Sequence, residues 1–227
     1  MRKQIVLGLG EIGGPLRNIL NCAGFDSKGE SDTAERLGVF EVLHICIPYS
    51  DNFIEVVRGY QAVFKPEITV IHSTVPIGTT CKIENAVHSP ILGKHSNMEQ
   101  SIRDFTKWIG GPLALAASSC FTDVGIKTKC VPKATETELF KLVCLAKYGK
   151  DIAFAGYVKG LCDIYGIDCN DMIKWDGNYN AHVQPYLMRP LIDPPKEKIS
   201  GHCVIPGTRL LNEQHHNLML DEVLKYA

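Results

Sequence analysis

The chain has 227 residues, enough for about one and a half domains of ordinary size. Its hydrophobic fraction of 45% and charged fraction of 22% allow a proper core and exclude global disorder. The formal net charge is −1 and no basic stretch stands out, so nothing in the sequence indicates nucleic-acid binding and we expect no nucleic-acid partner. The apolar runs are too short to span a membrane.

The N-terminus leads directly into an apolar run and has no signal-peptide pattern, which predicts a cytoplasmic protein. The nine cysteines are an odd number and include no Cys-x-x-Cys pair. We therefore expect free thiols, with neither a disulfide framework nor a zinc site. The eight histidines show no metal-binding spacing, and we predict no metal.

The first 132 residues alternate short apolar runs with helical patterns. Strands are expected at 4–7, 42–47, 68–72, 113–117 and 129–131, and helices at 12–23 and from about 51 to 64. This alternation predicts an α/β fold, with a mostly parallel sheet covered by helices on both faces. The short segment between Asp26 and Val42 predicts that this part of the sheet is abbreviated.

After Pro132 the pattern becomes helical. A capping box formed by Thr135 and Glu138 is expected to start a long helix that ends near Gly166, although Gly149 weakens the pattern locally. Residues 176–208 read as an irregular loop region and residues 210–224 as a last helix. We therefore expect two domains, an α/β domain at 1–132 and a second, smaller, all-helical domain at 133–227.

Residues 8–13 read Gly-Leu-Gly-Glu-Ile-Gly and match the dinucleotide-binding pattern G-x-G-x-x-G. The loop follows an apolar strand and opens an amphipathic helix, the context in which this pattern binds a pyrophosphate on a helix N-terminus. The α/β domain is therefore predicted to be Rossmann-like. We assign cofactor contacts to the residues of this loop: Gly8, Gly10, Glu11, Ile12 and Gly13.

An acidic residue is expected at the end of the second strand of such a domain, and Asp26 stands there. A carboxylate at this position accepts hydrogen bonds from both ribose hydroxyls and repels a 2′-phosphate. The sequence thus favours NAD over NADP. Pro48, Ser73 and Thr74 follow later strands and are expected to line the cofactor site.

Four further segments carry a more specific pattern. They are His-Ser-Thr-Val-Pro-Ile-Gly-Thr-Thr at 72–80, Trp-Ile-Gly-Gly at 108–111, Glu-Leu-Phe-Lys-Leu at 138–142 and Gly-His-Cys at 201–203. In order and approximate spacing they resemble the NAD-dependent nucleotide-sugar 6-dehydrogenases (the UDP-glucose/GDP-mannose dehydrogenase family), which belong with the 6-phosphogluconate and 3-hydroxyisobutyrate dehydrogenases. The resemblance covers nearly the whole chain but only the first half of a family member, so we expect the family's nucleotide-sugar domain to be absent.

The resemblance implies catalytic roles for Thr74, Lys141 and Cys203. In the family the threonine helps to hold a water, the lysine stabilises oxyanions, and the cysteine attacks an aldehyde intermediate. Each residue also has a non-catalytic explanation. Thr74 could contact the cofactor, Lys141 could form a surface ion pair with Glu138, and Cys203 could be an inert thiol.

The sequence departs from the family at three polar positions. The carboxylate expected after Ser-Pro is Ile91, an expected asparagine is Leu145, and an expected aspartate is Gly207. Three functions therefore compete: an NAD-dependent oxidoreductase acting on a sugar or sugar nucleotide, an NAD-binding protein with a degenerate site, and a single-step hydroxy-acid dehydrogenase that uses Lys141 alone. The resemblance and the long apolar stripe of the helical domain also predict a homodimer.

Overall fold

The computed structural model describes residues 2–27, 38–93, 97–195, 198–199 and 202–227. The chain divides into two compact units, Met1–Lys141 and Leu142–Ala227. The domain boundary expected at residue 132 falls within the first unit. Within the described residues, no helix has both the length and the apolar character needed to cross a bilayer.

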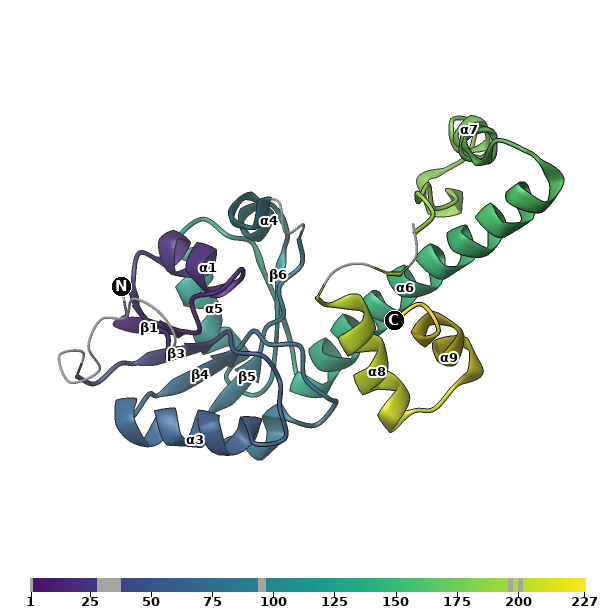
Figure 1. The fold of residues 1–227 in the computed structure, drawn as a ribbon. Coiled ribbons are helices and arrows are strands. Elements are labelled where there is room, and N and C mark those ends of the chain that lie inside the picture. Colours follow the sequence, from purple (N-terminus) through teal and green to yellow (C-terminus); the bar gives the residue numbers. More distant parts are fainter. Residues whose placement is uncertain (1, 28–37, 94–96, 196–197, 200–201) are drawn as a thin grey trace. The chain divides into compact units, whose positions relative to one another are not determined.

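The first unit contains a seven-stranded sheet in the order β2-β1-β3-β4-β5-β6-β7 (Figure 1). Neighbouring strands are parallel, except that β5 and β6 pair in antiparallel fashion through His88 and Gly110. This sheet confirms the predicted α/β, Rossmann-like, mostly parallel fold. The strands are β1 (Gln4–Leu7), β2 (Ala23–Phe25), β3 (Val42–Ile45), β4 (Ile68–Ile71), β5 (Ala86–His88), β6 (Lys107–Gly110) and β7 (Thr128–Val131).

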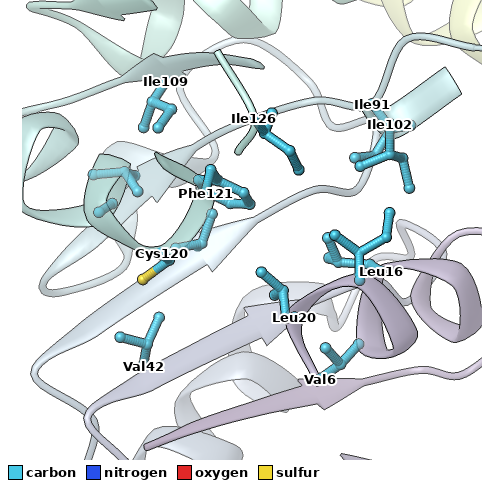
Figure 2. Close-up of a cluster of buried hydrophobic side chains, with 14 of the residues drawn as sticks. Val6, Leu16, Leu20, Val42, Ile91, Ile102, Ile109, Cys120, Phe121 and Ile126 are labelled. Carbon is cyan, nitrogen blue, oxygen red and sulfur yellow. The ribbon is translucent and has the colours of Figure 1, made fainter. Parts of the chain in front are cut away.

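Helices cover both faces of this sheet because its central strands are apolar on both sides. One face is covered by α1 (Gly13–Leu20), α4 (Met98–Asp104) and α5 (Ala114–Thr122), and the other by α3 (Phe53–Phe64). Figure 2 shows the first of these cores, where Leu16 and Leu20 of α1 and Phe121 of α5 pack with strand residues. The residues between β4 and β5 include a short 3₁₀ helix, η1 (Thr80–Lys82).

Several sequence-based boundaries in the first unit are wrong. Residues 113–117 were expected as a strand, but Ala114, Ala117 and Phe121 are buried at helical spacing in α5. A short apolar run does not distinguish the two structures. Helix α1 ends at Leu20 because Asn21 adopts the left-handed conformation, and Gly24 lies in β2 instead of terminating the helix. The abbreviated segment before Val42 falls mostly outside the described residues.

The long helix α6 (Ala134–Tyr165) has 32 residues and continues from the first unit into the second. It is unbroken at Gly149, where a Cβ atom would lie 2.7 Å from Val223 Cγ1 and 2.8 Å from Val204 Cγ1. The glycine therefore permits close helix packing within the second unit. The predicted capping box is also wrong, because Thr135 lies inside the helix and the Glu138 carboxylate binds elsewhere.

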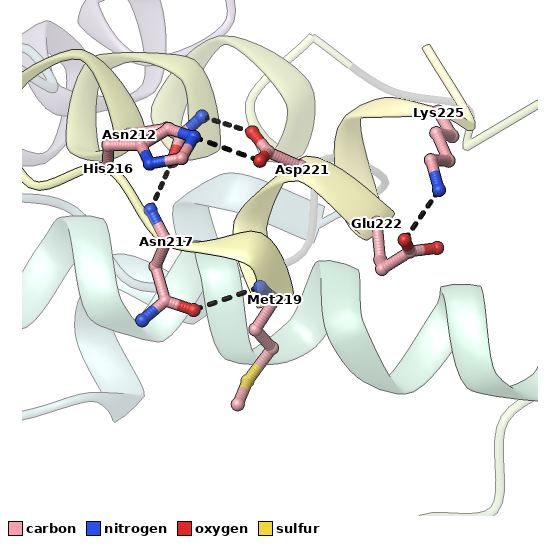
Figure 3. A network of polar contacts seen from close by, with 7 residues as sticks. All are labelled: Asn212, His216, Asn217, Met219, Asp221, Glu222 and Lys225. Atoms are coloured by element: carbon pink, nitrogen blue, oxygen red, sulfur yellow. Dashed lines mark hydrogen bonds and ion pairs between the residues drawn. The ribbon is translucent and has the colours of Figure 1, made fainter.

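The rest of the second unit is helical: α7 (Cys169–Asn180), the 3₁₀ helix η3 (Pro185–Leu187), α8 (Val204–Gln214) and α9 (Leu218–Leu224). The helix expected at 210–224 is thus two helices. Figure 3 shows why: the Asn217 side chain accepts a hydrogen bond from Met219 N and caps α9, while Asp221 accepts one from Asn212 of α8. The predicted irregular region, 176–208, likewise contains the end of α7, all of η3 and the start of α8.

Candidate cofactor and active site

The glycine loop between β1 and α1 has two positions where only glycine fits. A Cβ atom on Gly13 would lie 1.7 Å from the Gly8 carbonyl oxygen. Gly8 itself has a φ of +85°, and a Cβ there would lie 2.8 Å from Cys46 O. These two residues therefore serve the tight turn and the close approach of helix to strand.

Gly10 differs from both, because a Cβ atom there would meet nothing within 4 Å. It is exposed, as is Glu11, and Ile12 is the N-cap residue of α1. The Ile12 side chain makes no capping hydrogen bond, and the first turn of α1 contains no acidic residue. Open backbone at a helix N-terminus is the environment that binds the pyrophosphate of a dinucleotide.

Asp26 follows β2 and reaches back to the glycine loop. Its Oδ2 accepts a hydrogen bond of 2.7 Å from Leu9 N. The carboxylate is half-buried and lies beside the loop, where a ribose-binding acid is required. The loop residues and Asp26 thus fit a dinucleotide.

The two hydroxyl residues after β4 have different environments. Ser73 is buried, and its Oγ donates to Ile47 O at 2.5 Å, so its hydroxyl ties together the ends of β4 and β3. Thr74 is half-buried, and its side chain makes no hydrogen bond within the described part of the chain. Pro48 is exposed just beyond β3. Thr74 and Pro48 are therefore better placed than the Ser73 hydroxyl to contact a ligand.

Glu138 and Lys141 lie in the part of α6 that belongs to the first unit. Glu138 is fully buried, and its carboxylate accepts hydrogen bonds from Gly78 N at 2.6 Å and Thr80 N at 2.8 Å. It anchors this turn instead of forming half of an exposed ion pair. Lys141 Nζ donates to Ile91 O at 2.9 Å.

Cys203 is the N-cap residue of α8 and is half-buried, while its neighbour His202 is exposed. Gly201, the remaining residue of that motif, lies outside the described residues. Lys141 and Cys203 belong to different units. Their shared catalytic role therefore stays a prediction.

The three residues that replace expected polar groups are all buried. Ile91 is part of the hydrophobic core of the first unit. Leu145 and Gly207 contact each other within the second unit. Their positions are therefore occupied by apolar packing.

A chain of buried polar side chains in the first unit escaped the sequence analysis. His44 Nε2 lies 2.8 Å from Gln4 Oε1, and His44 Nδ1 lies 3.1 Å from His72 Nε2. His72 Nδ1 is in turn 3.1 Å from Lys107 Nζ. Burial, reinforced by the positive charge of Lys107, lowers the pKa of His44 to about 3 and that of His72 well below its usual value.

His88 forms a second buried polar group. Its Nδ1 lies 2.8 Å from Thr137 Oγ1 of α6, and its Nε2 lies 3.2 Å from Ser73 O. Burial lowers the pKa of His88 to about 3. The sequence signal for both groups was a histidine inside an apolar run.

The second unit has a cavity of about 440 Å³ between α6, α7 and residues 189–194. Its lining is largely apolar and includes Phe154, Met172 and Leu191. The Arg189 guanidinium pairs with Asp176 at 2.7 Å and lies 3.9 Å from the centre of the Tyr179 ring. The charge of Arg189 is therefore neutralised within the unit.

All nine cysteines are present as free thiols. Burial raises the pKa of Cys22 and of Cys46 to about 12, so these two thiols are poor nucleophiles. Across the described ranges, no group of three or more His, Cys, Asp and Glu side chains is arranged to hold a metal ion. The prediction of no metal remains a prediction.

No protein-family model matches the sequence, and no curated protein matches it. Solved structures do share its fold. A UDP-D-ManNAc dehydrogenase from Pyrococcus horikoshii is 20% identical with a TM-score of 0.83, and the match covers 98% of this chain and 68% of that one. A UDP-glucose dehydrogenase from Pyrobaculum islandicum is 16% identical with a TM-score of 0.79, covering 100% of this chain and 68% of that one.

A shorter enzyme has the same fold. The 3-hydroxyisobutyrate dehydrogenase of Mycobacterium tuberculosis is 14% identical with a TM-score of 0.73, and the match covers 99% of this chain and 92% of that one. The chain thus has a dehydrogenase fold and spans about two thirds of the two nucleotide-sugar enzymes. At these identities the similarity establishes the fold.

Proposed function

We propose that this protein is an NAD-dependent oxidoreductase that oxidises an alcohol of a sugar or sugar nucleotide. The observation that carries the proposal is the glycine loop, in which Gly8 and Gly13 build the turn and Gly10 leaves open backbone. Asp26 beside this loop supports NAD over NADP, because a carboxylate there repels a 2′-phosphate. Bound NAD would supply the hydride acceptor.

The residues proposed to act on the substrate are Lys141, Thr74 and Cys203. An ammonium group at Lys141 would stabilise a developing oxyanion. One of its partners is Ile91 O, a neutral carbonyl that a substrate oxygen can replace. Thr74 has a hydroxyl available for a water or a cofactor. Cys203 would act as the nucleophile on an aldehyde intermediate.

Thermal stability measured with each cofactor tests the cofactor part of the proposal. NAD at a hundredfold excess over its dissociation constant should stabilise the protein by about 2.7 kcal/mol, and NADP should stabilise it less. Asp26→Ala should narrow that difference. Equal shifts by the two cofactors in the unmodified protein would refute the ribose assignment.

The reaction itself is tested by NADH formation with a panel of nucleotide sugars that includes UDP-glucose. Turnover should depend on Lys141, with Lys141→Met inactive and the exposed control Lys133→Met active. Activity that persists in Lys141→Met would remove this residue from the reaction.

A second candidate is an NAD-binding protein without turnover. It is favoured by the burial of Ile91, Leu145 and Gly207, which leaves three polar catalytic positions apolar. Saturable NAD binding together with no NADH from any substrate of the panel would favour it. The single-step hydroxy-acid dehydrogenase is a third candidate, supported by the shared fold with 3-hydroxyisobutyrate dehydrogenase, and it predicts one NADH per substrate.

We also propose that the protein forms a homodimer through its second unit. Phe154, Tyr157, Ile164 and Tyr165 of α6 are more than half exposed, an unusual density of apolar side chains for one helix. Sedimentation analysis should give a dimer that Phe154→Asp weakens. The control Leu115→Asp, at an exposed leucine of α5, should leave the dimer intact.

A further inference from the structure

We propose that Lys107, at the start of β6, is a positioning residue for Lys141. It would act by fixing the backbone carbonyl groups of residues 89–91, of which the last accepts the Lys141 ammonium. This inference rests on the proposed role of Lys141, but its test does not require turnover.

The two lysines hold consecutive carbonyl oxygens. Lys107 Nζ donates to Ser89 O at 2.5 Å and to Pro90 O at 3.0 Å. Lys141 Nζ donates to the next carbonyl, Ile91 O, at 2.9 Å. Because the three carbonyls belong to one short segment, the position of the first two constrains the third.

The segment needs such donors because it has left the sheet. Strand β5 ends at His88, and its only paired residue on β6 is Gly110. Among the described residues, two side chains approach these carbonyls: His72, whose Nδ1 lies 2.7 Å from Ser89 O, and Lys107, which reaches both Ser89 O and Pro90 O. Both lie in a buried part of the unit, where an unsatisfied carbonyl is costly. The Lys107 side chain supplies the donor to Pro90 O and shares Ser89 O with His72.

Burying a lysine amino group at this position costs free energy that an apolar residue of similar size would not cost. Lys107 is 4% exposed, and its Nζ lies 5.5 Å from the centre of the Phe121 ring. In the described part of the chain no carboxylate pairs with it. Burial lowers the pKa of Lys107 well below its usual value, and the positive charge of Lys141 acts in the same direction. An apolar residue would fill the core here but would release the 89–91 segment.

Competitive acetylation of lysines, quantified by mass spectrometry on the full-length protein, tests this role. A hydrogen bond from an ammonium to a carbonyl suppresses acylation, because it stabilises the protonated amine. The measured quantity is the rate for Lys141 divided by that for Lys133, an exposed lysine just before α6. Lys107→Met removes the side-chain donor to Pro90 O and one of the two groups that approach Ser89 O, and it should raise this ratio about threefold or more.

Two other variants complete the experiment. Lys129→Met, at an exposed lysine of the neighbouring strand β7, should leave the ratio unchanged. Lys107→Arg keeps donors for the carbonyls and should restore the ratio toward that of the unmodified protein. If Lys107→Met does not fold, Lys107→Gln replaces it. The glutamine amide is still a hydrogen-bond donor, but its side chain is shorter than that of lysine and does not reach the two carbonyls as lysine does. The acetylation ratio should therefore rise again.

An unchanged or lower ratio in the folded Lys107 variant would overturn the positioning role. A lower ratio would mean that Lys107 acts on Lys141 through its charge. The outcome is independent of the proposed reaction. If the ratio rises but the unmodified protein shows no turnover, the positioning role stands and the proposed reaction is refuted. If turnover depends on Lys141 but the ratio is unchanged, the reaction stands and the positioning role is refuted.

Discussion

Leu145 of α6 occupies the space beside Gly207 of α8, where a Cβ atom would lie 2.5 Å from Leu145 Cδ1 and 3.3 Å from its Cβ. Both residues stand where the resembling dehydrogenases have polar groups. The leucine and the glycine therefore fit each other, and replacing one of them alone would not restore a polar site. This contact therefore favours the second candidate, an NAD-binding protein without turnover.

The fit between these residues predicts non-additive stability changes. Gly207→Ala should destabilise the protein by about 1 kcal/mol, because overpacking outweighs the gain in helix propensity. In a Leu145→Ala background the same change should stabilise it, since the obstruction is gone. Urea unfolding of the two single variants and the double variant measures the coupling, and strict additivity would contradict the packing described.

In the glycine loop, substitution of Gly10 should affect NAD binding, whereas substitution of Gly13 should affect the free energy of unfolding. Gly10→Val should change the free energy of unfolding by less than about 0.5 kcal/mol, because its side chain enters open space. It should nevertheless abolish the thermal shift produced by NAD. Gly13→Ala should destabilise the free protein strongly, because its Cβ would collide with Gly8 O. A full NAD shift in folded Gly10→Val would exclude this loop as the cofactor site.

The buried histidines predict loss of stability in acid. The unfolded chain takes up protons on histidine near pH 6.5, whereas burial lowers the pKa of His44 and His88 to about 3 in the folded protein. Stability should therefore fall as the pH drops below about 6.5, by roughly 1 kcal/mol per pH unit for each histidine. Lys107, whose pKa is also depressed, acts in the same direction from its unfolded pKa of about 10.4 downward.

Urea unfolding between about pH 6.5 and pH 4 measures this slope. His44→Gln should reduce it by the contribution of one histidine. His182→Gln, at an exposed histidine of the second unit, is the matched control and should leave the slope unchanged. Equal slopes for all three proteins would mean that His44 is protonated in the fold.

The role of Cys203 predicts a stoichiometry. A double oxidation through a thiohemiacetal yields two NADH per substrate, and Cys203→Ala should reduce that yield to one or abolish turnover. Cys144→Ala, at an exposed cysteine of α6, should behave like the unmodified protein. Turnover unaffected by Cys203→Ala would leave only a single-step reaction.

Elements were predicted correctly where the sequence pattern fits only one kind of secondary structure. The strand, glycine loop and helix at residues 4–20 were predictable, because their hydrophobic periodicity and the turn chemistry agree. Residues 113–117 were misjudged since five apolar residues fit a strand and a helix equally well. β5 and β6 were missed because they have only three and four residues, and each has a polar residue at one end, His88 and Lys107.

The candidate site was predictable only where residues act through the backbone. Gly8 and Gly13 could be recognised from spacing because their role is steric. The buried positions of His44, His72 and Lys107 depend on contacts between distant strands, which no local pattern encodes. Glu138 was interpreted as a helix cap, although the amides that donate to its carboxylate, Gly78 N and Thr80 N, lie about 60 residues earlier in the chain.

The reversed direction of β6 has a consequence for where functional groups can arise in such a sheet. In a fully parallel sheet, the residues that reach the ligand edge follow the strands, and a residue at the start of a strand lies at the opposite edge. Reversal exchanges the two ends, so Lys107, as the first residue of β6, comes level with the segment that leaves β5. Strands β6 and β7 both run against β1–β5, so the ligand edge of this sheet also receives side chains that precede a strand.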